Sequence, residues 1–146
     1  MEPTATTAPA VAECPDAAQR IYFLQSADLT VTLAESFGNI GALFAGAAED
    51  PTLLLSERWR LDVVAEMVSM ELVADGIRDL DPPAPGTEEI HAVLQRMPVK
   101  LEAVVEALTN GLDNLDGAGL QRGTTILGQL IDDIVEAGEL ALTFCE

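Results

Sequence analysis

The sequence is poor in basic residues. Seven lysines and arginines stand against 25 acidic residues in a chain of 146, which gives a net charge of −18, and Lys100 is the only lysine. Such a surface repels phosphate groups and anionic lipid head groups, so the electrostatic attraction that nucleic-acid-binding proteins use is missing. The composition predicts no nucleic-acid partner. It leaves room for a basic partner, and it also fits an acidic coat that only solvates the protein.

Aromatic residues and long hydrophobic runs are also scarce. Aromatic residues make up 4% of the chain, although hydrophobic residues make up 49%. A core of Ala, Leu, Val and Ile suits packed helices better than sheets rich in aromatic and β-branched residues. No apolar run approaches the ~18 residues that a membrane-spanning helix needs, so the sequence predicts no membrane insertion.

Helical periodicity is present in four segments, where apolar residues recur at alternating spacings of four and three. The segments are separated by turn signals around Pro51, in DPPAPG at 81–86 and in DGAG at 116–119. Four helices with short connections predict an all-α, antiparallel, up-down-up-down four-helix bundle with both termini at the same end. The predicted helices cover residues 16–48, about 53–80, 87–115 and 120–144.

Individual residues allow finer predictions. Pro98 lies inside the third segment, but the apolar register continues on both sides, so we expect a kink near 94–97 and not two helices. Thr87 is placed to cap the start of that helix. In the fourth segment, Gly123 allows close approach of a neighbour. The first segment has a face of small residues, which predicts that a second neighbouring helix packs closely on Ala27, Val31, Ala34, Gly38, Gly41 and Ala45.

The first 13 residues, MEPTATTAPAVAE, differ in composition from the rest of the chain. They are small or polar and include two prolines, which predicts a disordered tail or tether at 1–13 before a single domain at 14–146. Tails rich in Thr, Ala and Pro often link exported domains to a signal or lipid anchor. An ordinary flexible N-terminus is the alternative.

The sequence has only two cysteines. Cys14 precedes the first predicted helix and Cys145 closes the fourth, and the predicted topology brings both to the same end. We therefore predict a Cys14–Cys145 disulfide, which indicates an oxidising compartment and an exported bacterial protein, secreted or surface-tethered. Residence in the cytoplasm of a salt-adapted organism is the alternative, and it predicts free thiols.

No catalytic motif is recognisable. The spacing of Glu88 and His91 occurs in dimetal centres of helical bundles, but those centres need a second such motif, and His91 is the only histidine. A solvated helix start is the favoured interpretation. Met67, Met70 and Met97 lie on apolar faces, which favours core packing over soft-metal binding. The sequence predicts no enzyme, no cofactor and no metal ion.

A second apolar stripe lies on the second predicted helix, opposite its main apolar face. Either an adjacent helix covers it, or it is an interface for a homodimer or another protein partner. We expect a non-catalytic, exported helical-bundle protein that acts through protein contacts. The alternatives are a bundle that binds an apolar small ligand between its helices, and a carboxylate/His metal-binding bundle. The stripe consists of Leu61, Val64, Val68 and Leu72.

Overall fold

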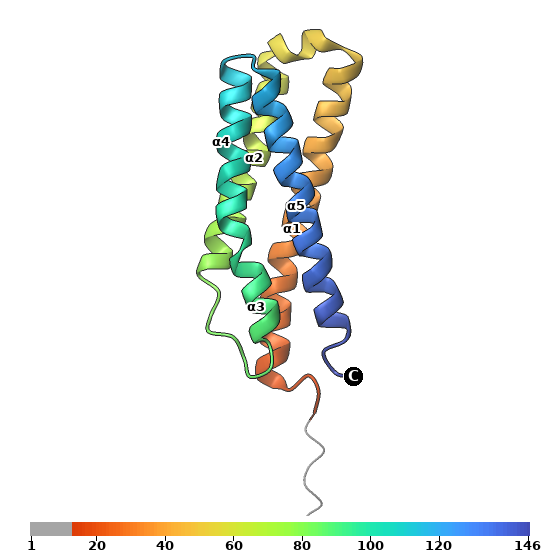
Figure 1. Ribbon diagram of the computed structural model, residues 1–146, viewed down its shortest axis with the longest axis vertical. Coiled ribbons are helices and arrows are strands. Elements are labelled where there is room, and N and C mark those ends of the chain that lie inside the picture. The colour runs from red at the N-terminus through yellow and green to blue at the C-terminus, as the bar shows by residue number, and fades with distance from the viewer. Residues whose placement is uncertain (1–12) are drawn as a thin grey trace, which may run out of the picture.

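The computed structural model describes residues 13–146, and this part of the chain is all helical, with no strand (Figure 1). The predicted all-α class is confirmed. Of the predicted tail, all but Glu13 lies outside the described residues. The elements are α1 (Ala17–Glu49), the 3-10 helix η1 (Pro51–Leu55), α2 (Glu57–Arg78), α3 (Glu88–Gln95), α4 (Met97–Asp113) and α5 (Gly117–Leu142).

The helix starts follow from polar residues that satisfy free backbone N–H groups. At α1, the Asp16 carboxylate accepts from the Gln19 N–H, and the Gln19 side chain accepts from the Asp16 N–H, both at 2.8 Å. This reciprocal pair is a capping box. Pro15 immediately precedes this cap. At α2, the Ser56 hydroxyl accepts from the Trp59 N–H at 3.3 Å.

The helices lie side by side along the long axis of the molecule (Figure 1). α1 packs against α2, α2 against α4, and α4 against α5, whereas direct contact between α1 and α5 is slight. Full burial of one large aliphatic side chain stabilises a fold by about 1.5–3 kcal/mol. The largest side chains that are completely buried include Leu33, Ile40, Met70, Leu101, Leu108 and Leu130.

The contact between α4 and α5 is close because glycines face it. A Cβ on Gly119 would lie 3.1 Å from the Gly111 Cα, and a Cβ on Gly123 would lie 2.6 Å from a Leu108 methyl carbon. Neither helix could approach the other this closely with larger side chains there. The predicted role of Gly123 is confirmed.

The small-residue face of α1 is not used in this way, so the predicted close packing on it was wrong. A Cβ on Gly38 or Gly41 would meet no atom within 4 Å, and Val31 is 57% exposed. The face is uncovered because α5 packs on α4 and not along α1. The side of the molecule between α1 and α5 is therefore loosely packed.

The third helical segment is interrupted in the predicted region, but it forms two helices, α3 and α4, and not one kinked helix. Pro98 has no N–H with which to continue the α-helical hydrogen bonding, and its ring crowds the carbonyl of Leu94. The Arg96 N–H instead donates to the Val93 carbonyl at 3.2 Å, a tighter 3-10 pattern.

Thr87 occupies the N-cap position of α3, but its side chain makes no capping hydrogen bond, so the predicted side-chain cap was wrong. Its hydroxyl donates to the Ala84 carbonyl at 2.6 Å, and its side chain is completely buried. Its backbone N–H donates to the same carbonyl at 3.0 Å. Thr87 therefore closes the turn before α3, and the first helical turn carries Glu88 and Glu89, which suit the helix dipole.

None of the helices between residues 13 and 146 combines the length and the hydrophobicity that a bilayer crossing requires.

Candidate functional site

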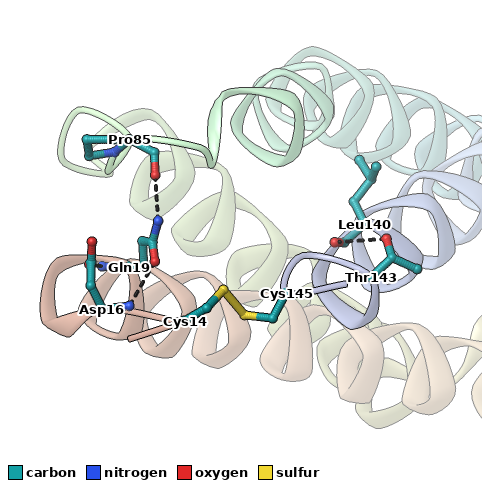
Figure 2. The surroundings of a disulfide bond; sticks show 7 residues. All are labelled: Cys14, Asp16, Gln19, Pro85, Leu140, Thr143 and Cys145. Atoms are coloured by element: carbon teal, nitrogen blue, oxygen red, sulfur yellow. Dashed lines mark hydrogen bonds between the residues drawn. A yellow bond between two sulfur atoms is a disulfide. The ribbon is translucent and has the colours of Figure 1, made fainter. Parts of the chain in front are cut away.

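The start of α1 and the end of the chain are joined by a Cys14–Cys145 disulfide, as predicted (Figure 2). The two Cα atoms are 5.7 Å apart, although 131 positions separate the residues in sequence. Two further contacts hold this end. The Gln19 side chain donates to the Pro85 carbonyl at 2.8 Å, and the rings of Phe23 and Phe144 pack edge to face at 5.0 Å. The loop before α3 is thus tied to α1, and α1 to the chain end.

An open hollow of about 570 Å³ lies beside the disulfide. Its lining includes the acidic residues Glu13, Asp16 and Glu89. Among residues 13–146, no group of three or more His, Cys, Asp or Glu side chains is arranged to hold a metal ion. The Asp16 carboxylate already accepts the Gln19 N–H. The hollow therefore has the character of a solvated, acidic helix end.

His91 is bonded to a buried tyrosine. Its Nδ1 lies 2.8 Å from the Tyr22 hydroxyl, and the ring centroids are 5.8 Å apart. Burial raises the pKa of Tyr22 to about 12. The hydroxyl therefore stays protonated near neutral pH and has a proton available for the bond to His91. This bond links α1 to α3 and occupies one of the two ring nitrogens that a metal ion could use.

The methionines that the sequence places on apolar faces are buried. Met70 and Met97 are completely buried, and Met67 is nearly so. Met67 also receives a weak hydrogen bond, from the Thr109 hydroxyl to its sulfur at 3.8 Å. All three fill space in the core between the helices.

A buried ionic cluster was missed in the sequence. Asp133 on α5 is only 5% exposed. Its two carboxylate oxygens accept from Lys100 Nζ at 2.6 Å and from Arg96 at 3.2 Å. Arg96 also donates to Glu136 at 2.7 Å, and this bond, with the charge of the two carboxylates, raises the pKa of Arg96. Because each Asp133 oxygen already has a cationic partner, the cluster suits positioning of α5 better than proton transfer.

The second apolar stripe of α2 is exposed. We call Leu61, Val64, Val68 and Leu72 the α2 patch; their exposed fractions range from 43% to 66%. A hollow of about 240 Å³ lies next to the patch, between α2 and α4, and Val64 and Val68 line it. The rim of this hollow carries charges of both signs, among them Arg60 and Glu71.

An apolar cleft of about 340 Å³ lies between α1, α3 and α5. Ile90 and Leu94 of α3 line it together with residues of the two flanking helices, including Ala27 on α1 and Gly138 on α5. The sequence contained a partial signal of this cleft, because the small-residue face of the first predicted helix includes Ala27. It could not show that α5 leaves this face uncovered.

Comparisons with protein-family models, with curated proteins and with solved structures find no match to this chain.

Proposed function

We propose that residues 14–146 form a single-domain, antiparallel, up-down-up-down four-helix bundle with both termini at the same end. We also propose that the protein is an exported bacterial protein that has no catalytic activity and acts through protein contacts. The observation that carries the proposal is the α2 patch. Four aliphatic side chains exposed in one stripe exceed what the fold requires, and such patches mark sites of association. The disulfide supports export, because structural disulfides persist in oxidising compartments.

Among possible partners, the α2 patch is best suited to a second copy of the same chain. In a two-fold interface each copy presents the same surface, so a patch with charges of both signs can be complementary to itself. Arg60 and Glu71 lie on opposite sides of the patch centre along α2. An antiparallel pairing of two α2 helices brings Arg60 of one copy toward Glu71 of its partner. Val64 and Val68 are then buried at the centre.

Sedimentation velocity over a concentration series tests this interface. We expect the wild-type protein to dimerise and Val68→Glu to be a folded monomer, because the substitution places an unpaired charge in the apolar contact. Val99→Glu is the matched control, since Val99 is 69% exposed on α4, outside the patch. A wild-type protein that stays monomeric, or equal dissociation by both substitutions, contradicts the interface.

The apolar cleft supports a second candidate function, the binding of a small apolar ligand. Its volume of about 340 Å³ is near the lower end of the range of ligand sites, about 300–1,000 Å³. Native mass spectrometry of the protein from its own host provides the test. A stoichiometric organic adduct that Ala27→Trp abolishes supports this function, and adduct-free protein contradicts it.

A further inference from the structure

The apolar cleft continues along both of its flanking helices. Val31 follows Ala27 of the cleft by four residues, and Val135 precedes Gly138 by three, so each lies on the same helix face as a cleft residue. Ile131 extends this face by one more turn. Val31, Ile131 and Val135 are each about half exposed. We call the surface formed by these residues and the cleft the α1–α5 groove.

The groove is open along its length. A Cβ on Gly38 of α1, or on Gly128 or Gly138 of α5, would meet no atom within 4 Å. The contrast on α5 is Gly119, which is buried against α4. One face of α5 is therefore packed and another is free, which is the pattern of a helix that has room for one more neighbour.

The charges beside the groove are acidic. On α1, Asp28 lies three positions before Val31 and Glu35 lies four positions after it. On α5, Asp132 and Glu139 have the same spacing around Val135. Each valine therefore has a carboxylate one helical turn away in both directions. α1 and α5 carry only two basic residues, Arg20 and Arg122, and Arg20 is paired with Glu13 at 3.5 Å. An apolar groove between acidic margins is complementary to a basic partner.

We propose that the α1–α5 groove binds an amphipathic helix of a partner protein, with an apolar stripe flanked by Lys and Arg. Such a helix lays its apolar face in the groove and places its basic residues against the acidic margins, a common mode of peptide recognition. A second copy that presented the same groove would bring acidic margins against acidic margins, so a basic partner fits better. A small ligand fills the cleft but leaves Val31, Ile131 and Val135 uncovered. The proposal does not depend on the α2 patch.

The probe is a fluorescent peptide of about 20 residues, which forms roughly 30 Å of helix, built from Leu and Lys in an amphipathic helical pattern. One control peptide has the same composition in an order without amphipathicity, and another has Glu in place of Lys. We expect fluorescence anisotropy to show binding of the first peptide alone. Binding should weaken when salt is raised from about 0.01 to 0.15 M, because exposed charges are then screened.

Two valine substitutions separate groove binding from simple charge attraction. Val135→Glu should weaken binding of the Leu/Lys helix by about tenfold or more, because it places a charge in the apolar contact. Val99→Glu adds the same charge on α4, so it should leave binding unchanged or slightly tighter. Circular dichroism confirms that both variants are folded, as expected for substitutions at exposed positions.

Several results would overturn the proposal. Equal binding of the scrambled Leu/Lys peptide, or no loss with Val135→Glu, would show only electrostatic adhesion. Dissociation of a dimer by Val135→Glu would assign the groove to a second copy, and a retained organic adduct with no peptide binding would assign it to a small ligand. Val68→Glu keeps the two proposals distinguishable, because it should change the oligomeric state and leave peptide binding intact.

Discussion

Lys100, the only lysine of the chain, donates a hydrogen bond from Nζ to the Asp133 carboxylate at 2.6 Å. Asp133 also accepts from Arg96, which lies between α3 and α4. A carboxylate that is 5% exposed would be destabilising without such partners. The two cations therefore hold α5 against the junction of α3 and α4, where Pro98 interrupts the backbone hydrogen bonding.

Removal of this carboxylate should destabilise the fold. Asp133→Ala loses two charge-assisted hydrogen bonds and leaves Lys100 without its partner, so we expect the free energy of unfolding to fall by about 2–3 kcal/mol. Asp132→Ala is the control, since Asp132 is the exposed neighbour on the same helix, and its change should stay within about 0.5 kcal/mol. Urea denaturation measures both. Equal effects would show that the buried pair contributes nothing particular.

The disulfide should provide much of the stability. In the chain-entropy model, a bond that closes a loop of this length contributes about 5 kcal/mol, which is comparable to the net stability of a small domain. We expect a loss of this size for the double variant Cys14→Ser/Cys145→Ser in denaturant unfolding. Reduction should destabilise the wild-type protein and leave the double variant unchanged. If reductant does not change the free energy of unfolding of the wild-type protein, the disulfide does not stabilise the fold as proposed.

Substitution by alanine should have opposite effects on stability at two glycines of α5. Gly119→Ala places a Cβ 3.1 Å from the Gly111 Cα and 3.3 Å from the Ala107 carbonyl oxygen, and these backbone atoms cannot move aside easily. We expect a loss of about 1–3 kcal/mol. Gly128→Ala meets open space and should stabilise the helix by about 0.5–1 kcal/mol. Thermal unfolding compares the two, and a stabilised Gly119→Ala protein would disprove the close α4–α5 contact.

Tyr22 should make the stability of the fold depend on pH in the alkaline range. Its pKa is raised by burial from 10.0 to about 12, so the folded state holds the phenolic proton more tightly than the unfolded state. This contribution is fully present below pH 10 and is lost as the pH rises toward 12. Because Tyr22 is the only tyrosine, its ultraviolet absorbance titration reports it directly. A titration midpoint near 10 in the folded protein would contradict the burial.

Much of the fold was predictable because helix periodicity and turn residues are local signals. The sequence correctly indicated the all-α class and the Cys14–Cys145 disulfide, and it located the disturbance near Pro98 but predicted a kink where the structure has two helices. The pattern of α5 could not reveal Asp133 as buried, because its partners lie more than 30 positions away in the sequence. The role of Thr87 was missed for a related reason, since the carbonyl it bonds belongs to an irregular loop.

The candidate surfaces were predictable only in part. The α2 patch follows from spacing, because a helix with two apolar faces needs two neighbours or an exposed stripe. The α1–α5 groove does not follow from spacing. It depends on how far α5 lies from Gly38 and Gly41. The sequence cannot show this, because a face of small residues has the same pattern whether a helix covers it or not.

The most direct test of an exported, disulfide-clamped protein that acts through protein contacts is mass spectrometry of the protein isolated from its own host without reductant. One sample is denatured with a thiol-alkylating reagent, and another is sprayed under native conditions. We predict an unalkylated chain, with Cys14 and Cys145 bonded, and a dimer in the native spectrum. Alkylation of both cysteines would contradict the oxidising compartment, and a native monomer would contradict the proposed dimer.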